Sequence, residues 1–299
     1  MDMKIKSNRL TYYWMLKNTT QSAWIENKGR LLWLAFFFTE IGAGTYLVSL
    51  FINCRPGLLV GWFIALALGG FFHILFLGKP ARGWRIFNGI ASSELSRGLL
   101  IILFFAVIGS LQILPAVFPG LPWEGNGPIL SIIMGVICIL VISHGFLTIG
   151  VVKAVPIWNS PMMLPLSVVS GIWVGSQLVE MILLMSGSEI AIAEMWVRWS
   201  LVCFVGVLAV FLWWDSVHSS EIAKASIKRI LKGDLAGIFF ICVIAIGIII
   251  PLIITLLVWV RELSGFSSGI LFLRFLCIMF GDLMMRYCVF KSALYRPLI

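Results

Sequence analysis

Residues 128–150 read PILSIIMGVICILVISHGFLTIG, a stretch with no Asp, Glu, Lys or Arg and a single histidine, His144. A helix rises about 1.5 Å per residue, so a run of this length suits a hydrocarbon core roughly 30 Å thick. The strict alternation of apolar and polar residues that a membrane barrel requires is absent from it. The stretch therefore predicts a membrane-spanning α-helix.

Other apolar runs of similar length accompany this one along the chain. Together they predict about eight spans, at 31–53, 58–77, 95–117, 128–150, 163–185, 195–215, 236–260 and 268–290. Hydrophobic residues make up 61% of the chain and charged residues 12%, which leaves more apolar surface than a soluble domain can bury. We expect an all-α polytopic membrane protein with two four-helix bundles, 31–150 and 151–290, between an N-terminal interfacial segment (1–30) and a C-terminal tail (291–299).

The basic residues are distributed unevenly between the two ends of these spans. Of 22 Lys and Arg, the ones that lie toward the end opposite the termini are Arg55, Arg198, Arg261 and Arg274. The positive-inside rule then predicts that both termini are cytoplasmic. The net charge of +9 is explained by this topology and by contact with membrane lipid, and it does not indicate nucleic-acid binding.

The six cysteines lie within or beside apolar runs and form no CxxC pair. This spacing is typical of small buried side chains and offers no ligand set for an iron–sulfur cluster. The chain also lacks a P-loop, a dinucleotide fingerprint, an HExxH motif and a nucleophile elbow. We therefore expect no metal site and no cluster in this chain, and whether it is itself catalytic stays open.

Three ionisable side chains lie inside the predicted N-terminal spans, where the cost of burial makes each a functional candidate. Glu40 lies roughly 15 Å from the cytoplasmic end of its helix, whereas His73 and His144 lie roughly 7–11 Å below the same surface. An imidazole can hydrogen-bond a quinone carbonyl or pass a proton, and a deeper carboxyl can relay that proton. We predict that His144, His73 and Glu40 bind quinone and that Glu40 is the proton relay, with helix packing as the alternative.

Other charged residues within the spans predict structural ion pairs. Glu180, toward the outer end of the fifth span, can pair with Arg198 or Arg274 on neighbouring helices. Asp282 and Arg286 are spaced for a pair within one helix.

Two loops on the terminus-bearing side combine basic and aromatic residues. One reads LGKPARGWRIFNGIASSELSRG from Leu77 to Gly98, and the other reads KAVPIWNSP from Lys153 to Pro161. Positive-inside charge alone would explain the arginines, but aromatic residues among them are typical of protein contact surfaces. The residues predicted to dock a partner protein are Lys79, Arg82, Trp84, Arg85, Arg97, Trp158 and Asn159.

The same loops carry a resemblance to a known family. GAGTYL (42–47), LGKPARGWR with SSELSRG, the VPIWNSP loop and the tail RYCVFKSALYRPL follow one another in that order. In these motifs the chain resembles the NrfD/PsrC family of membrane anchors, which includes the polysulfide and nitrite reductase membrane subunits and is related to the anchors of DMSO reductases. The resemblance runs from about residue 31 to the C-terminus.

The resemblance implies an eight-helix, haem-free subunit in a bacterial or archaeal cytoplasmic membrane, with menaquinone or ubiquinone bound in its first four-helix bundle. It implies two partners, a four-cluster ferredoxin-like iron–sulfur subunit and the molybdopterin catalytic subunit that this protein serves. His144 falls where the polysulfide reductase subunit has a quinone-binding tyrosine. Phe76 stands where DMSO reductase anchors carry a histidine, and His73 comes one turn earlier. Familiar members dock their partners outside the cell, whereas the charge asymmetry places this face in the cytoplasm.

Two other functions agree with parts of the pattern. In a b-type cytochrome, His73 and His144 would be axial ligands of one haem. In a proton-coupled secondary transporter, Glu40 would carry the coupled proton, although the sequence shows no inverted repeats.

Overall fold

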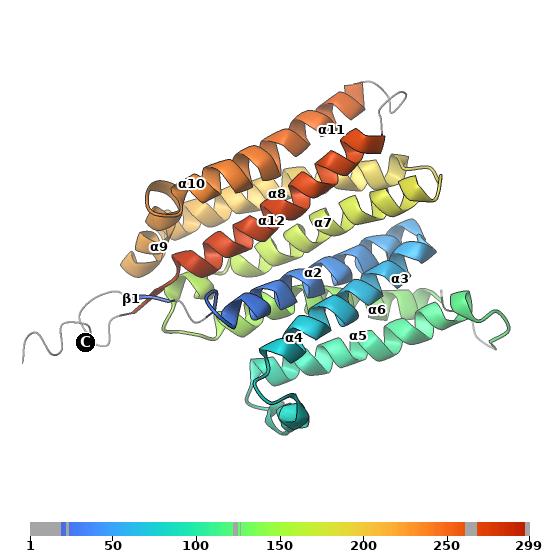
Figure 1. Cartoon of the computed structure of the whole chain (residues 1–299), viewed down its shortest axis with the longest axis horizontal. Coiled ribbons are helices and arrows are strands. Elements are labelled where there is room, and N and C mark those ends of the chain that lie inside the picture. Colours follow the sequence, from blue (N-terminus) through green and yellow to red (C-terminus); the bar gives the residue numbers. More distant parts are fainter. Residues whose placement is uncertain (1–18, 22–23, 122–124, 126, 261–267, 297–299) are drawn as a thin grey trace, which may run out of the picture.

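The computed structural model describes residues 19–21, 24–121, 125, 127–260 and 268–296. Within them, eight helical spans are long and apolar enough to cross a membrane: α2 (Gly29–Ile52), α3 to α4 (Arg55–Phe76), α5 (Glu94–Val117), α6 (Pro128–Gly150), α7 (Met163–Met185), α8 (Ala191–Val217), α10 to α11 (Ala236–Val260) and α12 (Ser268–Ser292) (Figure 1). The predicted all-α polytopic fold is confirmed. The clearest boundary difference is at α8, which starts before residue 195 because the charge of Glu194 is neutralised by Arg274.

Two of the spans change helix type partway. The second consists of α3 (Arg55–Phe63), the π-helical η2 (Ile64–Gly69) and α4 (Gly70–Phe76), and the seventh consists of α10 (Ala236–Ile238), the π-helical η5 (Phe239–Ile249) and α11 (Ile250–Val260). The shorter elements are β1 (Thr19–Thr20), η3 (Pro80–Gly89), η4 (Pro156–Asn159), α9 (Glu221–Lys232) and β2 (Leu294–Tyr295). π-helical turns are often found near functional sites, and η2 ends just before the turn that carries His73.

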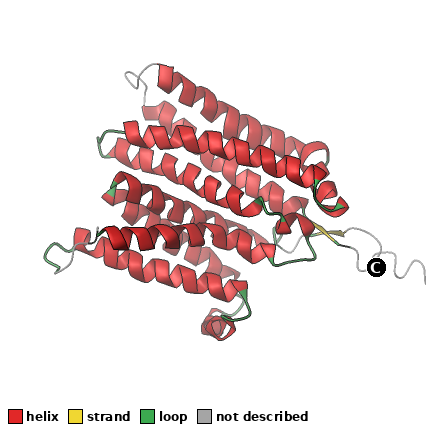
Figure 2. Cartoon of the chain, turned by 180° about the vertical axis from the view of Figure 1, so that it is seen from behind, coloured by secondary structure: helices red, strands yellow, loops and turns green. Residues whose placement is uncertain are grey.

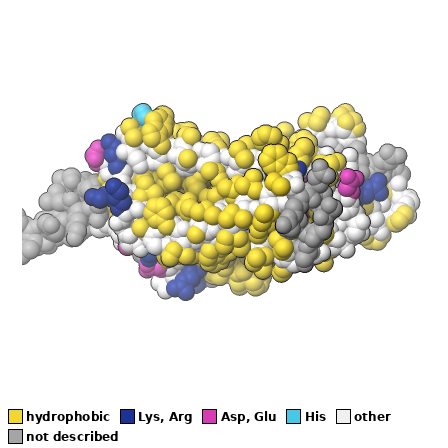
Figure 3. All heavy atoms as spheres, turned by 90° about the horizontal axis from the view of Figure 1, so that it is seen from above, with side chains coloured by type: hydrophobic (Ala, Val, Ile, Leu, Met, Phe, Trp, Pro, Cys, Tyr) yellow, Lys and Arg dark blue, Asp and Glu magenta, His cyan; other side chains and the backbone are white. Residues whose placement is uncertain are grey.

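Large apolar side chains face outward along the middle of the molecule. On α6, Ile129 is 75% exposed and Ile132 is 68% exposed. Figure 3 shows hydrophobic side chains gathered along the middle of one face, with charged side chains toward its two ends. A soluble protein rarely exposes so large an apolar surface, whereas lipid would cover it. The chain is therefore a multi-pass membrane protein.

Helix α2 lies at the centre and contacts α3, α4, α6 and α7. Its closest approach is to α7, where a Cβ built on Gly44 would lie 2.0 Å from the carbonyl oxygen of Gly171. Small residues at such crossings allow the backbones of membrane helices to touch. Figures 1 and 2 show α2 to α6 on one side of the molecule and α7 to α12 on the other. Since α2 packs on both α6 and α7, the division at residue 150 stays a prediction.

The two described ends of the chain lie together at one end of the helices. β1 pairs with β2 in an antiparallel ladder, and the Gln21 side chain donates a hydrogen bond to the Phe290 carbonyl, with an N–O distance of 2.7 Å. Elements η3, η4 and α9 also connect spans at this end (Figure 1). We call it the terminus-bearing end. Of the predicted N-terminal interfacial segment (1–30), residues 1–18 and 22–23 lie outside the described residues.

Candidate functional site

A cavity of about 460 Å³ lies between α2, the second span, η3, α5 and α6 at the terminus-bearing end. We call it the histidine cavity, and the side chains that line it are Leu32, Thr39, Ala65, His73, Ile74, Phe76, Leu77, Pro80, Ile86, Phe87, Leu95, Leu99, Ile102 and His144, with backbone at Gly70 and Gly83. Ile74, Phe87 and Leu95 are exposed, so the cavity reaches the apolar outer surface. Its volume falls within the roughly 300–1,000 Å³ of small-molecule sites.

His73 presents a free nitrogen at this cavity. Its Nδ1 lies 2.8 Å from the carbonyl oxygen of Gly69, one turn earlier in the span. A carbonyl only accepts hydrogen bonds, so Nδ1 carries the hydrogen and Nε2 of the neutral ring is a bare lone pair. Nε2 is buried and has no hydrogen-bond partner among the described residues. An unpaired buried acceptor is costly unless a ligand satisfies it.

His144 lies across from His73 on α6. Its Nδ1 is 3.2 Å from the hydroxyl oxygen of Thr148, and the residue is 3% exposed. A hydroxyl can donate or accept, so the Nε2 of His144 can present either a hydrogen or a lone pair. The ring packs directly on α5, where a Cβ built on Gly98 would lie 1.7 Å from the His144 Cε1 atom. Any side chain at position 98 would therefore displace the imidazole.

Phe36 on α2 holds the two imidazoles in one layer. Its ring is edge-on to both, with centroid distances of 5.7 Å to His73 and 5.9 Å to His144. The two imidazole centroids are 6.4 Å apart and their planes differ by 27°. The structure thus brings together the two histidines that the sequence placed at similar depth.

Glu40 belongs to a charged cluster behind this layer. It forms an ion pair with Arg286, whose Nε is 2.9 Å from Asp282 Oδ2 and whose Nη2 is 2.6 Å from the Ser170 hydroxyl. This Arg286 cluster joins α2, α7 and α12, and it confirms the predicted pair of Asp282 with Arg286. All four side chains are buried. One guanidinium faces two carboxyl groups, an arrangement that leaves room for one proton to neutralise the cluster.

The position of Glu40 corrects its predicted contact with the ligand. Glu40 is not among the residues that line the histidine cavity, and its carboxylate pairs with Arg286 on α12. Its Oε1 atom has no hydrogen-bond partner among the described residues, and it faces α6, where a Cβ built on Gly145 would lie 2.9 Å away. Gly145 follows His144 directly. Glu40 can therefore act only as a second group beyond His144, and its role as a proton relay stays a prediction.

Most of the predicted docking residues are exposed on and around η3. Trp84 is 63% exposed, and the Arg85 guanidinium lies 5.8 Å from its ring centroid. Lys79 and Arg82 are also exposed. Arg97 is half-exposed, but it binds Glu94 and the carbonyl of Ala91. It therefore fixes the conformation of the loop and also adds to its positive charge. The η3 segment projects from the terminus-bearing end, below α4 and α5 in Figure 1.

The second predicted docking loop is partly buried, and its tryptophan is among the buried residues. Trp158 is 1% exposed, packs edge-on against Trp24 with a centroid distance of 5.5 Å, and donates its indole hydrogen toward the Val289 carbonyl at 3.4 Å. Trp158 therefore has almost no exposed surface that a partner protein could contact, which corrects its predicted docking role. Asn159 is exposed, but its amide donates to the carbonyls of Val152 and Val155. This loop therefore packs beneath the terminus-bearing surface through Trp158 and is held in shape by Asn159.

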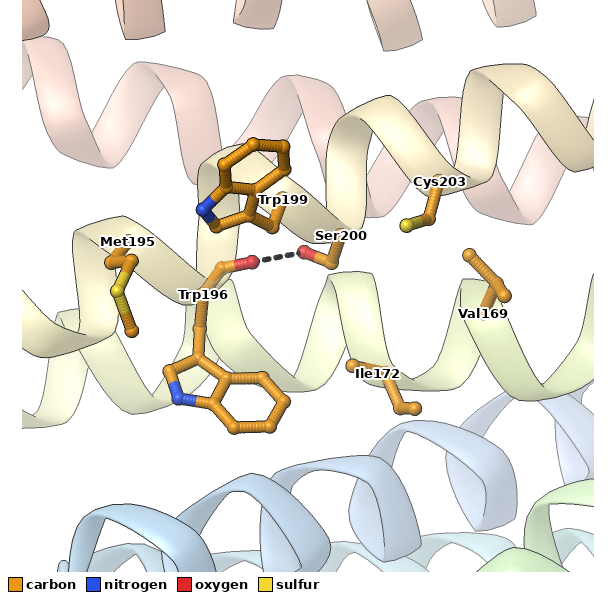
Figure 4. A pocket seen from close by; sticks show the side chains of 7 residues that line it. All are labelled: Val169, Ile172, Met195, Trp196, Trp199, Ser200 and Cys203. Carbon is orange, nitrogen blue, oxygen red and sulfur yellow. Dashed lines mark hydrogen bonds between the residues drawn. The ribbon is translucent and has the colours of Figure 1, made fainter.

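Another cavity, of about 370 Å³, lies between α7 and α8 (Figure 4). Its lining is apolar apart from the indole N–H groups of Trp196 and Trp199 and from Ser200, whose hydroxyl donates to the Trp196 carbonyl at 2.6 Å. No Asp, Glu, His, Lys or Arg side chain lines it, so it suits an acyl chain better than a ligand that exchanges protons.

Several residues of the site were not anticipated from the sequence. Thr148 follows His144 by one helical turn, a spacing that predicts a contact between their side chains. Phe36 and Gly98 lie in apolar and loop-proximal stretches with no distinguishing pattern, and the pairing of Glu40 with Arg286 joins the first and last spans. Such long-range pairs leave no local signal.

No protein-family model matches this chain, and no curated protein matches it either.

Proposed function

We propose that the chain is the quinone-binding membrane subunit of a respiratory oxidoreductase. It exchanges electrons between the quinone pool and a docked four-cluster iron–sulfur subunit that serves a molybdopterin catalytic subunit. The observation that carries the proposal is the pair of histidines facing one apolar cavity that reaches the outer surface of the spans. The loop motifs that resemble the NrfD/PsrC anchors support it independently.

The residues of the histidine cavity suit menaquinone or ubiquinone. Aliphatic and aromatic side chains can hold the ring and the isoprenoid tail, and the opening toward lipid lets a lipid-soluble ligand enter. The lone pair on His73 Nε2 suits a hydroxyl group of the reduced, quinol form, and the adaptable Nε2 of His144 suits either a hydroxyl or a carbonyl oxygen. When bound, a quinone supplies the redox chemistry, and the chain supplies binding, orientation and proton handling.

The tautomer of His73 assigns it the role of base. Because Nδ1 is committed to the Gly69 carbonyl, Nε2 accepts a hydrogen bond and then a proton from a hydroxyl group in the cavity. We assign the onward transfer of the proton to Glu40, whose unpaired Oε1 lies beside α6 at Gly145, the residue after His144. These roles favour oxidation of a quinol at this site.

The exposed Trp84 and its basic neighbours support a docking surface for the iron–sulfur partner. Aromatic and arginine side chains dominate the energetics of protein interfaces. The surface lies at the same end as the histidine cavity, so a docked cluster would be near the bound head group. The positive-inside rule puts this end in the cytoplasm.

The test compares His73→Gln and His144→Gln with His218→Gln in the intact complex. His218 is the remaining histidine and stacks on Trp214, far along the chain from the cavity. We expect quinol oxidation to fall by about 10²–10⁴-fold in the two cavity variants, because a positioned acid–base group is lost. Activity with an artificial dye that reacts at the catalytic subunit should stay normal in all three.

Unchanged quinol oxidation in both cavity variants would contradict the proposal. An absorption spectrum of the purified subunit separates it from the b-type cytochrome, since a haem band lost in both variants would replace the quinone assignment. Proton-coupled solute uptake by the chain alone in vesicles would instead indicate a transporter.

A further inference from the structure

A second buried charged cluster lies at the end of the spans opposite the termini. Arg274 on α12 binds Glu180 on α7 and Glu194 on α8, with its Nη2 atom 2.6 Å from an oxygen of each. Its Nη1 atom lies 3.1 Å from the Thr255 hydroxyl on α11. The side chains of Arg274 and Glu180 are 0% exposed and that of Glu194 is 1% exposed. This Arg274 cluster confirms the predicted pair of Glu180 with Arg274 and adds Glu194 to it.

The two carboxyl groups of this cluster meet each other. Glu180 and Glu194 each place a carboxylate oxygen 2.6 Å from the same Nη2 atom of Arg274, so the two carboxyl groups converge on one nitrogen. Two ionised carboxylates held this close together disfavour each other's charge, and a proton on one of them removes that repulsion. Arg274 is the fully buried cation of the cluster, whereas Arg198 lies 3.9 Å from Glu194 and is 31% exposed. A singly protonated carboxyl pair balances the charge of Arg274, so this arrangement favours one proton on the pair.

Unpaired polar atoms flank the carboxyl pair. The Gln177 amide donates to Glu180 at 2.5 Å, while its Oε1 atom is buried and has no hydrogen-bond partner among the described residues. The Nε atom of Arg274 is in the same situation. Gln177 and Arg274 are both 0% exposed. Buried polar atoms of this kind are the usual partners of internal water, which is also what a proton needs in order to move.

A cavity of about 260 Å³ between α8 and α11 adjoins this cluster and offers a route along which a proton could leave it. Two of its lining residues touch the cluster, since Thr255 accepts a hydrogen bond from Arg274 and the Arg198 Nε lies 3.9 Å from Glu194. The rest of the lining, including Trp199, Leu252 and Trp259, is apolar or aromatic and partly exposed. One layer of side chains separates the shared proton from this cavity.

We propose that Glu180 and Glu194 form a proton-binding site that exchanges its proton with water at the end opposite the termini, through the cavity lined by Arg198 and Thr255. Release transfers the proton from the carboxyl pair to water and leaves both carboxylates ionised beside Arg274 and Arg198. Binding reverses the transfer. The site is independent of the quinone assignment, since none of its residues lines the histidine cavity.

Four helices surround the carboxyl pair. Among the described residues, α12 contributes Arg274 and α8 contributes Arg198 beside Glu194 itself. Helix α7 carries Glu180 and the neutral Gln177, and α11 contributes the neutral Thr255. Residues 261–267, which include Arg261 and Glu262, lie outside the described residues. Asp282 and Arg286 belong to the other cluster, about two turns or more along α12.

The test is infrared spectroscopy of the purified full-length protein at neutral pH in H₂O and D₂O. We expect an absorption of a protonated carboxyl group that is lost in both Glu180→Gln and Glu194→Gln, because either amide removes the shared proton. It should persist in Glu40→Gln, which alters the other cluster, and in Glu189→Gln, which alters an exposed loop residue. The same absorption in the wild type and in both cluster variants would overturn the proposal.

A second measurement keeps the proposal testable if those variants fail to fold. Magnetic resonance of the Glu40→Gln protein with labelled glutamate carboxyls should still show a protonated glutamate at neutral pH, and a spectrum of ionised glutamates alone would overturn the proposal. Filling the small cavity with Leu252→Trp should slow hydrogen–deuterium exchange of that proton, whereas the lipid-facing Ile253→Trp should not. Equal exchange in the two variants would contradict the proposed route.

Discussion

Helix α12 carries two buried arginines, and each neutralises buried carboxyl groups in different surroundings. Arg286 and Arg274 each face two carboxyl groups and one hydroxyl group, drawn from other helices as well as α12. The Arg286 cluster lies behind two imidazoles and a cavity of about 460 Å³, whereas the Arg274 cluster adjoins a cavity of about 260 Å³ lined by arginine and tryptophan. The charge arrangement alone therefore does not define the function of either end.

The difference lies in what each cavity offers a ligand. At the terminus-bearing end, His73 lines a lipid-accessible cavity and its Nε2 lone pair has no partner among the described residues, which suits a ligand hydroxyl group. At the opposite end, the buried Gln177 Oε1 and Arg274 Nε atoms have no partner among the described residues, which suits water and protons. We therefore assign ligand binding to the terminus-bearing end and proton binding to the opposite end.

Removing either arginine should produce the largest effect. Arg286→Ala and Arg274→Ala each leave two buried carboxyl groups without their cation, and breaking a buried ion pair costs about 3–5 kcal/mol. Thermal unfolding in detergent should show both variants strongly destabilised or poorly folded. Arg97→Ala, which breaks a pair of half-exposed side chains, should cost at most about 1 kcal/mol.

Similar stability of all three arginine variants would contradict the role of the clusters in holding the helices together. Arg286→Lys and Arg274→Lys sharpen the comparison, because they keep the charge but lose the multiple contacts of a guanidinium. We expect them to be intermediate in stability.

A methyl group at position 98 should disable the histidine cavity without touching the ion clusters. The Cβ of Gly98→Ala would overlap the His144 ring, since the built atom lies 1.7 Å from Cε1. Overpacking of this kind costs about 1–3 kcal/mol, and the displaced imidazole should raise KM for quinol and lower its oxidation rate. Gly206→Ala on α8 is the control, because nothing lies within 4 Å of its built Cβ. Equal activity of the two variants would remove His144 from the site.

The exposed Trp84 should matter for the partner and not for the quinone. Trp84→Ala is expected to weaken binding of the iron–sulfur subunit by about 1–2 kcal/mol, the range of a moderate interface hot spot. Trp199→Ala is a matched control, because Trp199 is 66% exposed but lies at the opposite end, beside Arg198. Titration of the partner onto the membrane subunit measures both. Equal affinities would show that η3 does not dock the partner.

The smallest effect concerns pH at the terminus-bearing surface. Two hydrogen bonds from Arg229 hold the pKa of the exposed Asp234 below its ordinary value. A carboxyl whose pKa is depressed in the folded protein stabilises it above the unfolded pKa, and that contribution is lost as pH falls through the folded pKa. Arg229 also binds the carbonyls of Lys291 and Ser292, so acid should loosen α9 from the end of α12.

Hydrogen exchange in α9 measures this loosening. Asp234→Asn should show faster exchange at neutral pH and a weaker response to acid than the wild type. Glu221→Gln, which removes an exposed partner of Lys224 at the other end of α9, serves as the control. The same acid response in Asp234→Asn and the wild type would show that Asp234 does not control this contact.

The sequence predicted the spans well because apolar length is a local property. The runs ending at Gly150 and Met185 match α6 and α7, while α8 was predicted too short because Glu194 looks like an end signal until its partner is known. Matched depth from the helix ends was enough to bring His73 and His144 together. The depth of a residue along a helix does not say which side of the helix its side chain is on. The sequence therefore did not show that Glu40 faces Arg286 and not the cavity.

Burial in loops was harder to predict than burial in spans. Trp158 was expected at the surface because its loop combines basic and aromatic residues, yet it packs against Trp24 and donates toward the Val289 carbonyl. Trp24, Trp158 and Val289 come from segments that are far apart in the sequence. Contacts between such distant segments have no signature in the local sequence.

The most direct test of the central claim is photoaffinity labelling of the purified protein with an azido-quinone, followed by peptide mapping. We predict label in the walls of the histidine cavity, at 70–87, 95–102 or around His144, and loss of that label when excess menaquinone or ubiquinone is added. Label confined to the apolar groove of α7 and α8 around Val169 and Cys203, or label that excess quinone does not displace, would contradict it.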